Sequence, residues 1–221
     1  MGSPPFAVLA AEAAPRLDEL ALAMAGEFGD VDARGALARL DALGAEIAAA
    51  AGGGGALGDP EAEAGVVADV LGRLHGFAGD REDYDHPDNS MLDRVLDRRA
   101  GLPILLSVVY VEAARRAGIE LHGVGMPGHY VVGHFGGPRP VLIDPFAGGV
   151  RNEAPSSSDV VPWGPHPTAL RMLNNLVGSY QRRHDLTRAI RAAELRLMLP
   201  LAAGDAATLT AELQGLRAIL N

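Results

Sequence analysis

The stretch of residues 101–118, GLPILLSVVYVEAARRAG, is apolar at nearly every position between residues 104 and 114. A helix that is apolar almost all round its axis is buried in the interior of a protein. Pro103 stands where proline is best tolerated, in the first turn of a helix, and Gly118 favours a helix end. The sequence therefore predicts one buried helix. At about 15 residues it is too short to cross a membrane, and Glu112, Arg115 and Arg116 interrupt its apolar surface.

A shorter amphipathic pattern precedes the buried helix. Apolar residues recur at helical spacing over residues 91–96, and charged residues occupy the other positions. The short polar residues 88–90 can accept hydrogen bonds from the free amides of a helix start, and Ser90 with Asp93 resembles a capping box. We therefore expect a helix that starts near residue 90 and ends at Gly101.

After the buried helix the hydrophobic period changes to two. Short alternating runs occupy residues 121–126, 130–135 and 139–144, and Pro-Gly and Gly-Gly-Pro sequences separate them. This pattern is typical of an antiparallel meander, whose strands can pack on the buried helix. The predicted fold class is therefore α+β, with a buried helix on a small antiparallel sheet and further helices on both flanks.

Composition along the chain divides it into five parts. Residues 1–50 predict a scaffold of two or three amphipathic helices, and residues 51–60 predict a flexible Gly-rich linker. The linker lacks the Gly-Lys-Ser/Thr ending of a phosphate loop. Residues 61–150 form the predicted core and begin with a helix. Residues 151–167, rich in Pro and Ser, predict an extended crossing to the C-terminal helices of residues 168–221.

The C-terminal part predicts three helices, over residues 168–183, 186–199 and 206–220. A short loop makes the first two an antiparallel hairpin. One hairpin and one helix cannot form a solenoid, which needs about three repeats. We expect these helices to pack on the core or to cap a homodimer.

Particular residues of the core resemble a known family. Gly101, the helix after it, the Gly128-His129 pair and the Asp144-Pro145 pair look like the transglutaminase-like, papain-related fold. The resemblance is greatest to the SirB-type transglutaminase-like domain and covers about residues 65–150. Similar domains are usually followed by tetratricopeptide-type helices, which the C-terminal helices resemble.

This resemblance implies where a reaction would occur. In catalytic relatives a cysteine opens the buried helix, a histidine takes its proton and a carboxylate orients the histidine. The resemblance carries the histidine to His129, the carboxylate to Asp144 and the cysteine to Pro103. The chain contains no cysteine, and proline has neither a nucleophile nor an amide hydrogen. Thiol chemistry is therefore excluded.

Other polar residues could line the same cleft. Ser107 lies one turn after Pro103, and its hydroxyl would need to lie about 2.6 to 3.2 Å from the histidine to react. The alternative is a serine that bonds back to the carbonyl of Pro103. Tyr110 is expected to fill core space, whereas Asn89 and Ser90 either reach the cleft or only cap a helix. The predicted binding cleft consists of Asn89, Ser90, Pro103, Ser107 and Tyr110.

His129 and Asp144 allow two interpretations. They are a hydrogen-bonded pair that joins two strands, or a general acid/base pair in a cleft. A metal site could also use His86 and His134, but no HxH or HExxH spacing supports it. His129 and His134 are five residues apart in one strand and so face opposite sides. We expect no metal and no cofactor.

The negative net charge of the chain argues against nucleic acid and membranes as partners. The net charge is −9, and all 19 basic residues are arginine, which leaves no cationic surface for nucleic acid or a membrane. The absence of cysteine excludes structural disulfides and cysteine-ligated metal sites. Nothing in the sequence resembles a leader or an anchor, so we expect a cytoplasmic protein.

Two functions from different classes remain. The first is a catalytically silent transglutaminase-like domain that binds a protein or peptide, or a small molecule, in the former cleft or on the C-terminal helices. The second is a non-thiol enzyme, a hydrolase or isomerase, in which His129 oriented by Asp144 is the general acid or base. The first is favoured because the nucleophile is missing.

Overall fold

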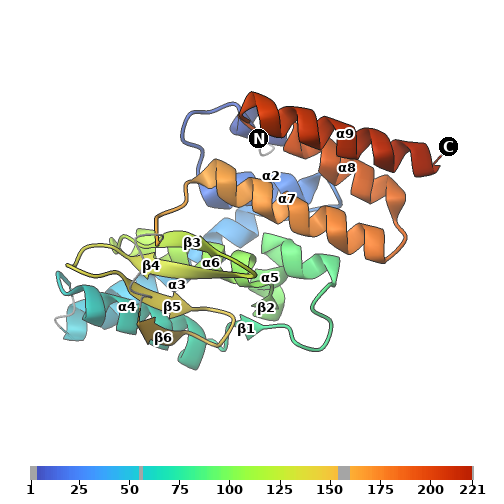
Figure 1. The fold of residues 1–221 in the computed structure, drawn as a ribbon. Coiled ribbons are helices and arrows are strands. Elements are labelled where there is room, and N and C mark those ends of the chain that lie inside the picture. The colour runs from blue at the N-terminus through green and yellow to red at the C-terminus, as the bar shows by residue number, and fades with distance from the viewer. Residues whose placement is uncertain (1–3, 55–56, 154–159, 221) are drawn as a thin grey trace.

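A computed structural model describes residues 4–54, 57–153 and 160–220. Figure 1 shows an α+β part, in which a sheet lies beside the central helix α6, and a layer of C-terminal helices above it. The fold class is α+β, as the sequence predicted. In the described residues no helix is long and apolar enough to cross a membrane.

The predicted buried helix is α6, Pro103–Arg116, and it occupies the centre of the α+β part. It packs against α3, Ala33–Gly54, and against the strands β3 and β4 described next. Gly44 permits the close approach of α3, because a Cβ atom there would collide with the side chain of Arg116. The helix ends before Gly118, whose φ of 78° glycine adopts without strain.

The predicted meander exists and has one more strand than expected. Strands β3, His122–Met126, β4, His129–His134, and β5, Val141–Asp144, pair antiparallel in chain order. A fourth strand, β6, Val150–Glu153, pairs with β5. The Pro- and Ser-rich composition had predicted that an extended crossing begins at residue 151. Pairing with β5, rather than an alternating pattern of its own, makes this segment a strand.

The helix before α6 starts and ends differently from the prediction. A 3₁₀ helix, η2, Pro87–Ser90, precedes α5, Leu92–Arg98. Met91 is the N-cap of α5, and no side chain of the described residues caps it, so the predicted capping box is absent. Arg99, with a φ of 56°, ends α5. Gly101 lies instead in a short parallel pair, β1, Ala78–Gly79, with β2, Ala100–Gly101.

The N-terminal part contains α1, Phe6–Ala10, α2, Leu17–Gly26, and α3. Because α3 continues to Gly54, the first residues of the predicted linker are helical, while residues 55–56 lie outside the described residues. Ala51 lies one turn after Ile47, and both are fully buried. This packing outweighs the poor helix propensity of glycine. The next helices are α4, Pro60–Ala68, and the π-helix η1, Asp69–Leu74.

The C-terminal helices are α7, Pro165–Arg182, α8, Leu186–Arg196, and α9, Ala203–Leu220. They stack in chain order, with α7 against α2 and η2 and with α9 outermost (Figure 1). Trp163 fastens the chain before α7 to the sheet, because its amide donates to the carbonyl of Gly123 over 2.8 Å. The hairpin therefore packs on the rest of the chain.

Candidate functional site

His129 and Asp144 lie at neighbouring ends of β4 and β5. The Nε2 atom of His129 is 2.9 Å from Oδ2 of Asp144. The other carboxylate oxygen, Oδ1, accepts the backbone amides of Phe146 over 3.0 Å and Ala147 over 3.2 Å. The turn after β5 thus holds the carboxylate in place, and the carboxylate in turn orients the imidazole.

The second ring nitrogen of His129 is free to act. Because Nε2 faces a carboxylate, it carries the proton, and Nδ1 is the basic nitrogen. Nδ1 has no hydrogen-bond partner in the described part of the chain, and 34% of the side chain is exposed. The arrangement can accept a proton or bind a hydrogen-bond donor. It also joins two strands, so both interpretations of the pair remain compatible with the geometry.

Aromatic and cationic side chains surround this histidine. The ring of Phe146 stands edge-on to His129, with 6.4 Å between centroids, and Tyr84 stands edge-on to Phe146 at 5.8 Å. The guanidinium of Arg81 lies 5.4 Å above the Phe146 ring. Tyr84 is 46% exposed. We call these four residues, His129, Phe146, Tyr84 and Arg81, the His129 surface.

The start of α6 carries no free nucleophile. Pro103 is buried in the first turn, where catalytic relatives would carry the thiol. The hydroxyl of Ser107 donates to the carbonyl oxygen of Pro103 over 2.8 Å. This is the back-bonding geometry that the sequence analysis gave as the alternative to a nucleophile. The Ser107 proton is therefore already used within the helix.

Tyr110 is fully buried one turn further along α6. Its hydroxyl has no hydrogen-bond partner among the residues described. A Cβ atom at Gly72 would lie 3.0 Å from the hydroxyl oxygen, and one at Gly149 would lie 3.1 Å from it, so these glycines make room for it. Burial raises the pKa of Tyr110 far above its ordinary value, and the charge of Asp144 adds to the effect.

Asn89 and Ser90 are buried as well. The Asn89 side chain donates to the carbonyls of Asp83 and Tyr84 over 2.8 and 3.2 Å, and its own oxygen accepts from Arg98 over 2.9 Å. Asn89 therefore organises the loop before it, whereas the Ser90 hydroxyl finds no partner in the described ranges. All five residues of the predicted cleft are buried, and their role in binding stays a prediction.

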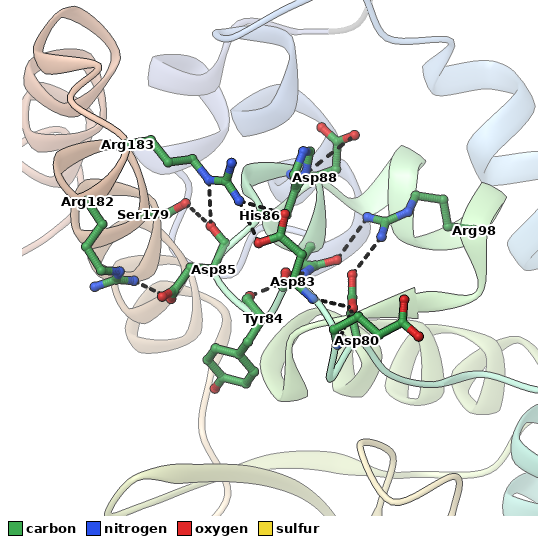
Figure 2. Close-up of polar contacts among 12 residues, drawn as sticks. Asp80, Asp83, Tyr84, Asp85, His86, Asp88, Arg98, Ser179, Arg182 and Arg183 are labelled. Atoms are coloured by element: carbon green, nitrogen blue, oxygen red, sulfur yellow. Dashed lines mark hydrogen bonds and ion pairs between the residues drawn. The ribbon is translucent and has the colours of Figure 1, made fainter.

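The loop of residues 80–88, which we call the acidic loop, is held by arginines from two helices (Figure 2). Arg98 of α5 donates to Asp80 over 2.7 Å. Arg183, after α7, donates to Asp83 over 2.6 Å. Figure 2 also shows Arg182 and Ser179 of α7 directed at Asp85.

Sequence reasoning missed these contacts across the chain. No partner had been predicted for Arg182 or Arg183, which contact Asp85 and Asp83. The density of aspartates in the acidic loop was the signal that could have indicated arginine partners.

The described residues hold no group of three or more histidines and carboxylates that could bind a metal ion. His134 is 2.6 Å from Glu63 of α4, away from the His129 and Asp144 pair. His86 accepts the amide of Asp88 through Nδ1 over 3.2 Å and caps η2. The three histidines considered for a metal site are thus engaged separately.

Comparison with known families assigns this geometry to a class. Residues 34–166 match the transglutaminase-like superfamily, so the chain belongs to that superfamily. The matched range includes α6, the complete meander and both members of the His129 and Asp144 pair. The class is therefore that of a transglutaminase-like domain without a cysteine.

Similar proteins occur in bacteria and animals. A UPF0162 protein of Xylella fastidiosa is 36% identical over 143 residues, which cover 56% of this chain and 51% of that protein. A UPF0162 protein of Vibrio cholerae is 35% identical over 74 residues, covering 33% of this chain and 27% of the relative. F-box only protein 21 of Homo sapiens is 36% identical over 70 residues, which cover 32% of this chain and 11% of that protein.

The chain thus spans about half the length of its Xylella relative and less of the others. No solved structure matches the chain.

Proposed function

We propose that this chain is a catalytically silent transglutaminase-like domain that binds a peptide, a protein or a small molecule at the His129 surface. The observation that carries the proposal is the start of α6, where Pro103 replaces the thiol and the Ser107 hydroxyl is bonded to Pro103. The exposed ring of Tyr84 and the free nitrogen of His129 supply the polar and aromatic groups that a binding surface needs.

Finer assignments belong to this proposal. We infer that the domain is of the SirB type and that α7, α8 and α9 form a tetratricopeptide-like segment. A homodimer through these helices is an alternative use of the segment. Nucleic acid and membranes are not expected partners of a chain with a net charge of −9. A cytoplasmic location stays a prediction.

A random-sequence peptide library displayed on phage tests the binding role. Peptides that bind the wild-type chain are measured again on His129→Ala and on His122→Ala. His122 is a suitable control because it is similarly exposed on the neighbouring strand β3, where it contacts Glu120 over 3.1 Å. We expect His129→Ala to weaken binding about tenfold or more. The substitution removes the imidazole, and with it a hydrogen-bonding nitrogen and the contacts that the ring makes with a ligand. Equal weakening by both variants contradicts the proposal.

The second candidate is a non-thiol hydrolase or isomerase that uses His129 as general acid or base. The geometry that favours it is the oriented imidazole, with Nε2 on Asp144 and Nδ1 exposed. The test is turnover of a panel of p-nitrophenyl esters and anilides by the wild type, His129→Ala and His122→Ala.

An enzyme should lose about 10²-fold or more in kcat/KM with His129→Ala and keep its rate with His122→Ala. If turnover by the wild type does not exceed that of His129→Ala, the enzyme hypothesis for these substrates is rejected and the binding proposal stands.

A further inference from the structure

One arginine beside the His129 surface has no carboxylate partner. Most arginines of the chain form ion pairs, as Arg183 does with Asp83. Arg171 of α7 forms none with any residue that the structure describes. It is nevertheless only partly exposed, and a partly buried charge without a counter-ion is unfavourable. An anion from outside the chain would remove this cost.

Arg171 is held in a fixed orientation. Its Nη2 atom donates to the backbone carbonyls of His129 and Met126, over 2.8 and 3.1 Å. Its guanidinium lies 5.6 Å from the ring centroid of Tyr130 and 5.8 Å from that of Trp163. Nε and Nη1 donate to no described residue, and both keep some accessible surface. These two nitrogens are therefore oriented in advance for a ligand, which lowers the entropy cost of binding.

The phenol of Tyr84 faces the same space as Arg171. Burial is the main cause that raises the pKa of Tyr84, and the charge of Asp85 adds to it; the positive charges of Arg171 and Arg182 oppose both. Such an influence requires the guanidinium to lie near the phenol. The Tyr84 hydroxyl bonds to no described residue, and Figure 2 shows its ring outside the set of ion pairs that hold the acidic loop. A ligand bound to Arg171 can therefore also accept a hydrogen bond from Tyr84.

A second arginine of the His129 surface is unpaired as well. Arg81 lies over the ring of Phe146 and forms no ion pair within the described part of the chain, although Glu82 follows it in the sequence. Asp144 is already bonded to His129 and to two backbone amides. The charge left unmatched here is therefore positive, although the net charge of the chain is −9. A ligand of complementary charge is an anion.

The exposure of the surface favours a peptide over a small molecule. The side chain of His129 is 34% exposed, and Tyr84 is 46% exposed. A small molecule needs a concave site that encloses most of its surface, whereas an extended peptide binds along an open one. A peptide also supplies backbone N–H groups, which the free Nδ1 atom of His129 can accept.

We propose that the ligand of the His129 surface is an acidic peptide segment, whose carboxylate binds Arg171 and the Tyr84 hydroxyl while a backbone N–H donates to Nδ1 of His129. Arg81 adds positive charge to the same surface. Hydrogen bonds between a guanidinium and a carboxylate are stronger than those between neutral groups, so the carboxylate contributes most of the specificity. This inference rests on the proposed function and names the chemistry of its ligand.

Selection of peptides from the random-sequence phage library gives the first test. The library is selected on the wild-type chain, on Arg171→Gln and on Arg139→Gln. Because the chain is acidic, peptides that bind without a specific site should be basic. We expect the wild type to enrich Asp and Glu at one position of the peptides, and Arg171→Gln to lose this enrichment. Arg139 is the matched control, since it is exposed and precedes β5 at the end remote from Asp144.

The outcomes of the selection separate this inference from the proposed function. Peptides that depend on His129 but carry no preferred acidic residue overturn the inference and leave the proposed function intact. If no selected peptide depends on His129, both are wrong. Loss of the acidic preference in Arg139→Gln as well as in Arg171→Gln would show that general charge, and not Arg171, causes it.

Affinities of the selected peptides give the second test. Replacing the acidic residue of a peptide by its amide should weaken binding to the wild type about tenfold and binding to Arg171→Gln less than about twofold. Tyr84→Phe removes only a hydroxyl at an exposed position, so it should reduce the effect of the acidic residue about threefold without any risk to folding. It keeps the test decisive if Arg171→Gln does not fold. An acidic residue that contributes equally in the wild type and in these variants overturns the proposal.

Phenylacetate, a small aromatic acid, tests the choice of a peptide. It is added in competition with a fluorescently labelled acidic peptide from the selection. We expect displacement only at a concentration about a hundredfold above that of the unlabelled peptide, because phenylacetate lacks the backbone N–H groups and most of the contact area. Displacement at the same concentration as the peptide would show that the surface takes a small acid, and the peptide assignment would be wrong.

Discussion

The two ends of α6 differ in the charge of their buried side chains. At the C-terminal end, Arg116 donates to Asp18 and Asp41 over 2.6 Å each and to Glu112 over 3.0 Å. Asp18 is fully buried and Glu112 nearly so. At the N-terminal end, the polar side-chain groups are the hydroxyls of Ser107 and Tyr110, and neither is ionised at pH 7.

This difference distinguishes charged side chains that stabilise the fold from polar side chains that could take part in a reaction. Buried charges are tolerated only when they are paired, as they are at the C-terminal end. Burial raises the pKa of Glu112, and the neighbouring Asp18 adds to the effect; Arg115 acts against both. In thiol relatives the N-terminal end would hold the reacting group, yet here it is neutral. The charges of α6 therefore stabilise the fold.

The largest expected effect comes from breaking the charged end. Arg116→Met removes the least exposed cation of the two buried carboxylates and leaves Asp18 with Arg16 and Glu112 with Arg115, so it should cost about 3 kcal/mol in the free energy of unfolding. Urea unfolding measures this. Arg115→Met is the control, because Arg115 is 46% exposed and its pairs are screened by water, so its loss should be within about 1 kcal/mol. Equal losses would show that the charged end is not a buried network.

The neutral end should respond in the opposite direction. Tyr110→Phe removes a buried hydroxyl that lacks a partner in the described residues and should leave stability unchanged or raise it by about 1 kcal/mol. Tyr130→Phe is the matched comparison, since its hydroxyl lies 2.8 Å from that of Thr168. It should lose about 1 kcal/mol in urea unfolding. A larger loss for Tyr110→Phe would reveal a partner for its hydroxyl.

Acid should act on the acidic loop instead of on the start of α6. The Asp83 amide is the main cause that holds the pKa of Asp80 below its ordinary value of 3.8; burial opposes this and Arg98 supports it. A lowered folded-state pKa gives stability that is present above pH 3.8 and is lost as the pH falls through the folded value.

Asp80→Asn should therefore be less stable than the wild type at pH 7, by about 1 kcal/mol, and the difference should shrink in acid. Urea unfolding at pH 7 and pH 3 measures it. Glu82→Gln, an exposed neighbour, is the control. A gap between wild type and Asp80→Asn that stays constant with pH would refute this assignment.

The smallest effect is expected at Ser107. Its hydroxyl bonds only within its own helix, so Ser107→Ala should change stability by less than about 0.5 kcal/mol. Thr168 makes the same kind of bond to Gly164 but also lies against the Tyr130 hydroxyl, so Thr168→Ala should cost about 1 kcal/mol more. Loss of ligand binding or turnover in Ser107→Ala would return Ser107 to the functional site.

Local pattern was enough to predict the parts of this fold whose neighbours lie close in the chain. The buried helix has an apolar surface all round, and three strands alternate between turns, so both could be predicted from periodicity. Strand β6 and the helical residues 51–54 could not, because pairing with β5 and packing beside Ile47 determine them. Tertiary contacts outweighed local propensity at both places.

The candidate site shows the same division. His129 and Asp144 were predicted from a family resemblance, and the structure places them 2.9 Å apart. Asn89 was predicted either to reach the cleft or to cap a helix, and its amide donates to the carbonyl of Asp83 in the acidic loop. The contact between Asp83 and Arg183 joins positions 100 residues apart. No periodicity in the sequence carries that information.

Helix α7 holds both flanks of the His129 surface. Its residue Arg171 donates to the backbone carbonyls of His129 and Met126, over 2.8 and 3.1 Å. Its residue Arg182 donates to Asp85 of the acidic loop, the residue after Tyr84. We therefore expect the β3–β4 turn and the acidic loop to open together with α7, as one cooperative unit of local unfolding. Their amide protons should exchange with solvent together, at a rate that follows the opening of α7.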